Sequence, residues 1–458
     1  DALTGWSNGL WARMYEGVSR ANEVLTQLEN TDVLTAEAAT RIEAQARFLR
    51  GYFYHELLWM FGGVPLFTKV PTVTEAREVT RSSRDEVFAM IVSDLTAAAE
   101  ALPESWPSAE YGRATKGAAL AYLARASLYE ASHKKYAEGD QNRANELFQA
   151  TEDAAQAVTD LNVYELYSDY RDLFTYAGEG SSEIIFDYQR LQGVNGWSAW
   201  TWLAPHSMGG DIDLTPTRAL VDRFYMVDGL PIDESPMYDS SPPIIQDGEA
   251  VSLGMYTNRD PRLYGTVLFP GAEFNGEVFN SYPSSPTSDR VINNVFTNTH
   301  TGYVWLKYVD PQDQSSPGNS GLNVIKMRYA DVLLMFAEAM IELGDVNAAL
   351  APLNQLRDRV GMPHVTAGSQ PEMIELVRNE RTVELAMEGL RLADIRRWRI
   401  AEDVMPGQVS GIDVDNGAST VTIRGAWTRN FTAPRDYLWP IPAPERDLNP
   451  NLEQNPGY

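Results

Sequence analysis

The sequence has no cysteine, few histidines and no long apolar run. Its 458 residues include 5 histidines, and 63 aspartates and glutamates outnumber 37 lysines and arginines, so the formal charge is −26. Without cysteine, the chain has no disulfides, zinc–thiolate sites or cysteine nucleophiles. No apolar stretch reaches the roughly 20 residues that span a bilayer. The negative charge disfavours nucleic-acid partners, because a polyanion is repelled.

Signatures of catalysis and metal binding are missing as well. No nucleophile elbow, phosphate-binding loop or dinucleotide fingerprint occurs. The histidines lack the i,i+4 spacing and neighbouring carboxylates of a zinc site; they are His55, His133, His206, His300 and His364. The acidic stretch "DVDNG" at 413–417 falls short of a full calcium loop. We expect no enzyme activity and no cofactor, with a structural calcium ion left open.

One charged series resembles a paired-carboxylate site. Its members recur every three to four positions, at Arg381, Glu384, Glu388, Arg391 and Asp394. Side chains with this spacing share one face of a helix, and arginines stand next to the acids. The pattern therefore predicts a salt-bridge ladder rather than a pair of catalytic carboxylates.

Helical periodicity is the strongest positive signal. Apolar residues at three- and four-residue spacing predict helices over 9–29, 35–61, 83–102, 115–133 and 142–159, and again over 326–343, 346–360, 371–389 and 391–401. Thr35 is placed as an N-cap, Gly62 predicts a left-handed helix end, and Gly344 predicts a break between two helices. The small residues of "GRATKGAALAYLARASLYEA" (112–131) allow the close packing found in tetratricopeptide hairpins.

The middle of the chain, from about 178 to 322, has a different composition. Proline, glycine, serine, asparagine and aromatic residues dominate it, with short strand-like pieces such as "EIIFDYQ" and "YVWLKYV". A structureless loop of this length does not belong in a compact domain, so we expect an ordered, irregular lobe. Such a lobe on a helical scaffold is where we expect the function.

The chain closes on "RDLNPNLEQNPGY" (446–458), which is neither helix nor central strand, because proline fixes φ and restricts the preceding residue. Together with the apolar "YLWPIP" before it, this predicts an ordered strap that lies in a groove of the folded body. The chain begins directly in helical periodicity at "DALTGWSNGLW", so we expect any targeting segment or lipid anchor to lie upstream.

Four blocks resemble the SusD/RagB-like nutrient-uptake lipoproteins: "ARFLRGYFYHELLWMFGGVPL" (46–66), "DPRLYGTV" (260–267), "RNERTVELAMEGLRLADIRRW" (378–398) and "YLWPIPAPERDLNPNLEQNPGY" (437–458). The resemblance implies a mostly α fold, a right-handed superhelix of tetratricopeptide-like hairpins with an irregular, loop-rich lobe and a few short strands. We expect a single domain with N-terminal hairpins (1–177), a ligand lobe (178–322), C-terminal hairpins (323–404) and an extended strap (405–458).

The resemblance also implies a function. From the resemblance we expect a surface-exposed outer-membrane lipoprotein that captures oligosaccharide or polysaccharide and delivers it to a SusC-like TonB-dependent transporter. Peptide capture within the same family and a helical glycoside hydrolase remain alternatives, as does a tetratricopeptide adaptor for other proteins. The lipid anchor is inferred from the resemblance alone.

The stretch "VNGWSAWTWLAPH" (194–206) is the principal candidate site, because it places Trp197, Trp200 and Trp202 within six residues. In an extended backbone Trp200 and Trp202 share one face, and flat apolar rings suit the faces of sugars. The alternative is that these rings anchor the lobe. Further predicted ligand residues are Asn195, Tyr282, Trp305 and Arg77. Tyr256, Phe274 and Tyr303 are secondary aromatic candidates.

Overall fold

The structure, a computed structural model, describes residues 4–290, 299–414 and 421–458. It contains two compact units. The first unit comprises Asp1–Tyr164, Leu392–Met405 and Phe431–Tyr458, and the second comprises Glu165–Arg391 and Pro406–Asn430. The chain therefore leaves the first unit at Tyr164 and returns to it twice. Among the described residues, no helix combines the length and apolarity that crossing a membrane requires.

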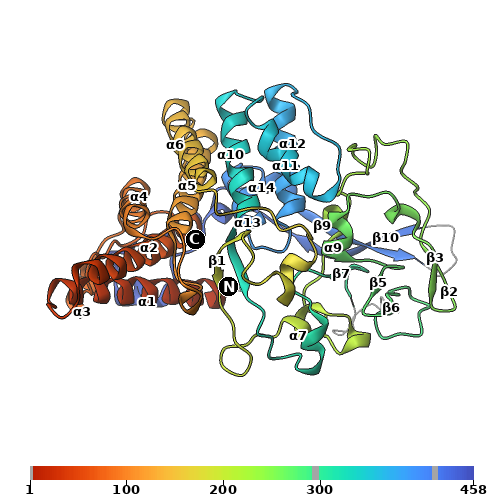
Figure 1. The fold of residues 1–458 in the computed structure, drawn as a ribbon, viewed down its shortest axis with the longest axis horizontal. Coiled ribbons are helices and arrows are strands. Elements are labelled where there is room, and N and C mark those ends of the chain that lie inside the picture. The colour runs from red at the N-terminus through yellow and green to blue at the C-terminus, as the bar shows by residue number, and fades with distance from the viewer. Residues whose placement is uncertain (1–3, 291–298, 415–420) are drawn as a thin grey trace. The chain divides into compact units, whose positions relative to one another are not determined.

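The first unit is built on five long helices (Figure 1). They are α1 (Thr4–Glu29), α2 (Ala36–Phe61), α4 (Arg84–Ala101), α5 (Lys116–His133) and α6 (Gln141–Asp160), with the short α3 (Val73–Glu78) after α2. Each long helix packs against the next, as expected for tetratricopeptide-like hairpins. The five helices predicted for this region are confirmed.

The helix ends follow from local chemistry. The Thr35 hydroxyl accepts a hydrogen bond from the amide of Ala38, which confirms the predicted N-cap. Gly62 ends α2 and donates its amide to the carbonyl of Leu58. Its φ of 76° is positive, as glycine permits, but its ψ of −141° is not left-handed helical, so the predicted cap type was wrong.

Small residues set the helix spacing. A methyl group on Gly17 of α1 would collide with the ring of Phe53 on α2. Along α5 the small side chains are buried between α4 and α6: Ala118, Ala119, Ala121, Ala124, Ala126 and Ala131. The alanine-rich segment therefore packs as the sequence predicted.

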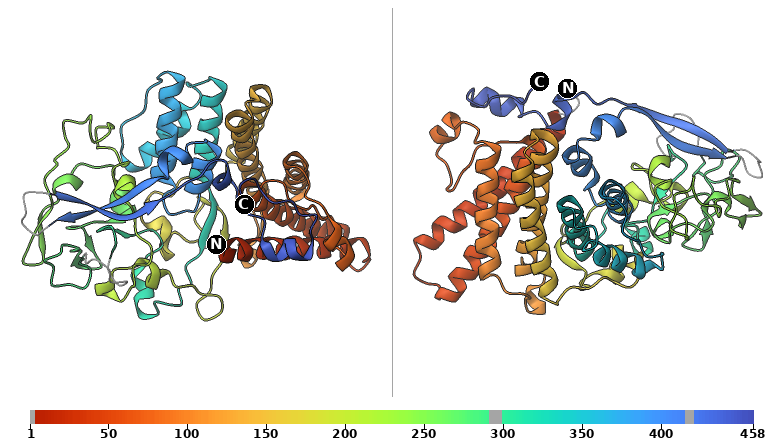
Figure 2. Two further views of the ribbon diagram at one scale, coloured as in Figure 1. Left: turned by 180° about the vertical axis from the view of Figure 1, so that it is seen from behind. Right: turned by 90° about the horizontal axis from the view of Figure 1, so that it is seen from above.

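The last residues of the chain form the predicted ordered strap on the first unit. The amide of Trp439 donates to the carbonyl of Met60 at 2.7 Å. The Asn455 side-chain amide donates to the carbonyls of Phe61 and Trp439, and its oxygen accepts from Arg81. Figure 2 shows α15 (Ala443–Leu448), drawn in blue, beside the red α1. Together with α13 (Arg391–Arg397) and α14 (Ala401–Val404), it completes this unit.

The predicted strap boundary needs correction. Residues 405–458 are not one extended segment, because β9 (Gly407–Val414) and β10 (Val421–Arg429) pair as an antiparallel hairpin that belongs to the second unit. The alternation in "VTIRGAWTR" suits a strand. Within the strap itself, α15 and a short turn of helix at Arg435–Tyr437 replace part of the expected extended chain.

The second unit combines three longer helices with short helices, strands and loops. Its helices α10 (Tyr329–Leu343), α11 (Leu350–Val360) and α12 (Gln370–Glu384) pack together, and Gly344 ends α10 at a φ of 91°, as predicted. The prediction of helix over 326–328 was wrong: β8 (Val324–Arg328) pairs with β1 (Ile184–Tyr188). The helix predicted to residue 389 ends at Glu384.

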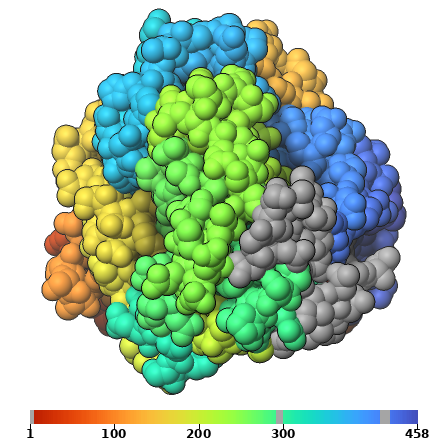
Figure 3. Space-filling view, turned by 90° about the vertical axis from the view of Figure 1, so that its right-hand side faces the viewer, coloured from red at the N-terminus to blue at the C-terminus, as the bar shows by residue number. Residues whose placement is uncertain are grey.

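The remaining strands form small antiparallel pairs in the irregular region. They are β2 (Ile244–Gln246) with β3 (Glu249–Ser252), β4 (Val267–Leu268) with β7 (Val304–Trp305), and β5 (Glu273–Phe274) with β6 (Glu277–Val278). Short helices belong to the same region: α7 (Ala199–Leu203) and α8 (Arg218–Val221) precede β2, and α9 (Arg262–Thr266) precedes β4. In Figure 3 the green segment of this region covers the middle of the visible face. The expected irregular lobe is thus ordered by many local pairings.

Buried ion pairs join the helices of the second unit to its irregular region. Glu384 contacts the guanidinium groups of Arg262, Arg328 and Arg359 at 2.6–3.1 Å. Burial opposes ionisation of Glu384, but these cations outweigh it and hold its pKa well below the usual range. Glu388 pairs with Lys307 and Arg328. The charged series is therefore structural, as predicted, and these ion pairs of Glu384 and Glu388 run to other elements rather than along one helix.

Candidate functional site

The predicted tryptophan stretch lies on an irregular edge of the second unit. The backbone of Trp197 exchanges two hydrogen bonds with Ser320, and its indole Nε1 donates to the carbonyl of Leu322 at 2.9 Å. Gly196 is needed beside it, because a methyl group there would collide with Asn319. The ring of Trp197 is thereby fixed in place while it remains half-buried.

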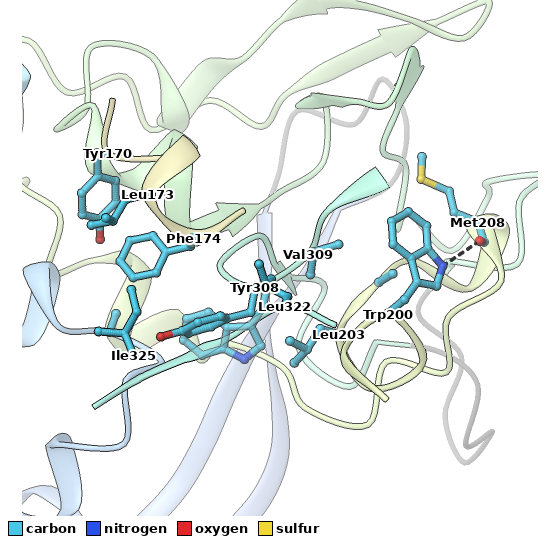
Figure 4. Packing of buried hydrophobic residues seen from close by; sticks show 13 residues of the cluster. Tyr170, Leu173, Phe174, Trp200, Leu203, Met208, Tyr308, Val309, Leu322 and Ile325 are labelled. Atoms are coloured by element: carbon cyan, nitrogen blue, oxygen red, sulfur yellow. Dashed lines mark hydrogen bonds between the residues drawn. The ribbon is translucent and has the colours of Figure 1, made fainter. Parts of the chain in front are cut away.

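Trp200 and Trp202 do not share a face, because the extended backbone on which that prediction depended does not form here. Residues Ala199–Leu203 form the helix α7, in which positions two apart point to nearly opposite sides. Trp200 is fully buried, and its Nε1 donates to the carbonyl of Met208 (Figure 4). Trp202 is 42% exposed. Trp200 is therefore a core anchor and Trp202 a surface ring.

Trp202 and Trp197 form an aromatic pair at the surface. Their ring centroids lie 6.3 Å apart in an edge-on arrangement. Behind Trp197 stands the buried Tyr308, at 6.2 Å, whose pKa is raised by burial, so its hydroxyl stays neutral. Leu214 is exposed next to this pair in the backbone, because its amide donates to the carbonyl of Trp202. We call Trp197, Trp202 and Leu214 the tryptophan patch; it presents a partly exposed ring on a rigid support.

The loop 189–195 borders the tryptophan patch. Arg190 lies over the exposed ring of Tyr188 at 4.4 Å and donates to the carbonyl of Asn195. The side-chain oxygen of Asn195 accepts from the amide of Leu191, and its nitrogen donates to the carbonyl of Gln189. Asn195 is therefore a loop-forming residue, and its predicted ligand contact stays untested.

Two other predicted rings are in the core. Tyr282 is fully buried and donates its hydroxyl to the carbonyl of Pro243 at 2.5 Å. Trp305 is 8% exposed and belongs to the cluster that contains Trp200. The prediction that either ring provides a second platform is wrong for this structure, because neither face is open to a sugar. Both residues pack on neighbouring strands and loops instead.

The secondary aromatic candidates are also packed inward. Tyr256 is stacked on Phe269 and donates its hydroxyl to that of Tyr303, and all of these rings are buried. Phe274 is half-buried against Trp200. These side chains hold the irregular region together, which the alternative interpretation of the aromatic residues anticipated.

Arg77 lies on α3 of the first unit and is exposed.

No group of three or more histidine or acidic side chains that could hold a metal ion occurs among the described residues. The stretch 413–417 lies outside them from residue 415 on. Neither the predicted role of Arg77 nor the open calcium site is tested by this arrangement.

Tyr188, Arg190 and Leu214 were missed by the sequence prediction. Tyr188 is exposed at the end of β1, whose burial alternates along the strand. The sequence pattern points the other way, because Tyr188 shares a strand face with the apolar Ile184 and Phe186, whereas the structure buries the face of Glu183, Ile185 and Asp187. Leu214 carries no sequence signal of this kind, because its position depends on the backbone contact with Trp202.

Comparison with known proteins places this geometry in a family. The model of the SusD family matches residues 175–458, and a second model, described as starch-binding associating with outer membrane, matches residues 4–128. The SusD-like protein P2 of Formosa agariphila is 27% identical over 99% of this chain and 81% of its own. Neither family description includes a catalytic activity.

Solved structures agree with this assignment. A SusD-like carbohydrate binding protein from Bacteroides fragilis has 29% identity and a TM-score of 0.84, over 97% of this chain and 85% of that one. A second SusD-like protein from the same species has 29% identity and a TM-score of 0.81, over 99% and 86%. Since the first family model covers more than half of the sequence, the chain belongs to the SusD family.

Proposed function

We propose that this protein captures an oligosaccharide on the tryptophan patch and delivers it to a SusC-like TonB-dependent transporter. The observation that carries the proposal is Trp202, a 42% exposed ring braced at 6.3 Å by the fixed indole of Trp197. An indole offers a large flat contact at a small cost in conformational entropy. The similar Bacteroides fragilis structure described as carbohydrate binding supports this ligand class.

The ligand we propose is neutral at this patch. The chain carries a formal charge of −26, which disfavours an anionic glycan on its open surface. Sugar hydroxyls need donors and acceptors; the side chain of Asn195 is used within the loop 189–195, so we expect the remaining N–H groups of Arg190 to serve as donors. Affinity should rise with glycan length, because a longer chain has more sugar rings that can contact the tryptophan patch and the adjoining loop 189–195.

We also propose that the protein acts without chemistry, at the outer membrane, through a lipid anchor upstream of this sequence. The acids that sequence spacing had brought into question, Glu384 and Glu388, are engaged by buried cations. The family description that matches residues 4–128 associates such proteins with the outer membrane. Docking to a transporter barrel is the step that follows capture in this proposal.

The test replaces the exposed ring and its support separately. Trp202→Ala should weaken glycan binding about tenfold or more, equivalent to roughly 1.4 kcal/mol, with nearly unchanged melting temperature, as measured by calorimetry. Trp427→Ala is the matched control, because Trp427 is 46% exposed in the same unit and lies on β10. It should bind as wild type.

A glycan array and a peptide panel on the purified chain provide the contradicting outcomes. Binding of peptides with no glycan binding would favour the peptide-capturing alternative. Release of reducing sugar during incubation would show a hydrolase. Unchanged glycan affinity in Trp202→Ala would remove the patch as the site, while co-purification with a SusC-like barrel tests the delivery step on its own.

A further inference from the structure

A cavity of about 200 Å³ lies within the first unit, far in sequence from the tryptophan patch. It is enclosed by the end of α2, the start of α4, the end of α5, α13 and the strap. Part of its wall is apolar and flat, formed by Trp59, Tyr129, Pro434, Tyr437 and Leu438. The rest is strongly basic, with Arg84, Arg396, Arg397 and Arg399 among the lining residues. This concentration of cations stands out in a chain of formal charge −26.

Two of the four arginines are neutralised by the protein. The Nε of Arg84 lies 2.7 Å from Glu130, which is buried beside it. The Nε of Arg397 lies 2.9 Å from Asp394 and its Nη1 donates to the hydroxyl of Ser132. These pairs explain why the half-buried Arg84 and the buried Arg397 are tolerated here.

The other two arginines form no ion pair among the described residues, although the charge of Asp436 acts on Arg396 from nearby. The Nε and Nη1 atoms of Arg396 are buried without a hydrogen bond. Arg399 lies over the ring of Tyr437 at 3.9 Å and forms no ion pair in the described part of the chain. Nearby acids are engaged elsewhere: Asp436 pairs with Arg435, and Glu402 accepts from Tyr437.

His133, which also lines the cavity, adds no positive charge to the wall. His133 lies 3.2 Å from Glu138. Burial, and then the charges of Arg84, Arg399 and Lys134, lower the pKa of His133, so this imidazole is neutral at physiological pH. The cavity therefore has more positive than negative charge at its wall, with buried N–H groups of Arg396 that an anion would satisfy.

We propose that this cavity binds the carboxylate of a small, flat organic acid, with Arg396 and Arg399 as its cationic contacts. A guanidinium presents two parallel N–H groups that match the two oxygens of a carboxylate. The aromatic and proline side chains would cover the flat body of the acid. At about 200 Å³ the cavity is smaller than the roughly 300–1,000 Å³ of drug-sized sites, so the ligand is about one ring in size.

The test titrates the purified chain with benzoate and with glucuronate, an aromatic acid and a sugar acid that share the carboxylate. Glucose and sulfate at matched ionic strength are the control solutes. We expect both carboxylates to bind and to raise the melting temperature. Arg396→Gln and Arg399→Gln should each weaken binding at least tenfold. Arg20→Gln is the matched control, since Arg20 is an exposed arginine of α1, and should bind as wild type.

A second readout guards against misfolding of the variants. Arg396→Met keeps the size of the side chain and removes its charge. We expect it to lose carboxylate binding while its melting temperature without ligand stays equal to wild type or rises. Circular dichroism confirms that it is folded. Trp202→Ala should leave carboxylate binding unchanged, so this site fails or holds independently of the glycan site.

Several results would overturn the proposal. One is that neither benzoate nor glucuronate shows saturable binding at concentrations up to about 10 mM, since a dissociation constant above that value means only weak association. Another is that wild type, Arg396→Gln and Arg399→Gln bind benzoate and glucuronate with equal affinity. A third is binding of sulfate as tight as binding of both acids, since that would show a general anion effect without the flat ligand we infer.

Discussion

The helices α1–α6 of the first unit and the irregular region of the second unit solve the same physical problem differently. Both must satisfy buried backbone amides and carbonyls. In the helices these groups bond to one another along the chain, and small residues of α5 let the helices approach. In the irregular region there is little regular pairing, so side chains must complete the bonding.

Arg259 shows how this is done. Its side chain is almost fully buried, and it donates to the carbonyls of Val221, Phe224 and Met255 at 2.7–3.1 Å. The neighbouring Arg262 bonds to acids from two regions. The comparison teaches that regular structure satisfies its own backbone and needs few buried ion pairs, such as Arg50 with Asp94, whereas irregular structure requires buried polar side chains that bond to the backbone as well.

The largest expected effect comes from removing the strap, residues 437–458, from the helical unit. Tyr437, Ile441 and Leu452 are buried, and each buried side chain contributes about 1.5–3 kcal/mol, so together about 5 kcal/mol or more would be lost. This is comparable with the whole stability of many domains. We expect the truncated protein to lose its cooperative melting transition near the wild-type temperature, as followed by circular dichroism.

Deleting Tyr458 alone is the control for strap removal. Its ring is 43% exposed and its hydroxyl makes one hydrogen bond, to the carbonyl of Leu438. We expect a loss of about 1 kcal/mol at most. If the long truncation melted like wild type, the strap would be an attached tail and not part of the fold.

The next effect concerns the buried charges of the second unit. Glu384→Ala leaves Arg262, Arg328 and Arg359 facing each other without their shared carboxylate. Removing one partner of a buried ion pair costs about 3–5 kcal/mol, and we expect this loss in denaturant unfolding. Glu375→Gln removes a carboxylate paired with Arg378 that is 70% exposed, and should cost about 0–1 kcal/mol.

The same carboxylate gives a pH dependence. The folded pKa of Glu384 is held below the value of about 4.3 in the unfolded chain. Its contribution to stability is therefore present above about pH 4.3 and is lost as the pH falls through the folded pKa. Wild type should lose stability more steeply on acidification than Glu384→Ala. Parallel curves in the two proteins would contradict this assignment.

Most of the regular structure was predictable from the sequence, because its causes are local. Thr35 and Gly344 mark helix ends through their own side-chain chemistry and backbone freedom. The ordered strap was also predictable, since proline and exposed apolar residues are incompatible with a free tail. The family followed from motifs of the same kind.

The candidate site was predicted only in part. Whether Trp200 and Trp202 share a face depends on a five-residue helix, α7, that the sequence does not mark. Trp305 and Tyr282 are buried by strands far away in the chain, so their burial could not be read from neighbouring residues. The pairs of Glu384 likewise come from Arg262 and Arg328, which no helical spacing connects to it.

The smallest expected effect lies in the loop beside the tryptophan patch. Asn195 holds this loop through two hydrogen bonds of its side chain, to the amide of Leu191 at 2.6 Å and the carbonyl of Gln189 at 3.0 Å. Both bonds are exposed, so Asn195→Ala should cost only about 1 kcal/mol of stability. Loosening the loop next to Trp197 should still weaken glycan binding, by a smaller factor than Trp202→Ala.

Gln192→Ala separates this positioning role from a general effect on the loop. Gln192 is exposed in the same loop, and no hydrogen bond of its side chain occurs within the described structure. Its replacement should leave melting temperature and affinity as in wild type. If both variants bind glycan like wild type, loop order does not contribute to the site, and the irregular region supports Trp202 through Trp197 and α7 alone. If Asn195→Ala abolishes binding at unchanged stability, its amide contacts the sugar directly, as the sequence had predicted.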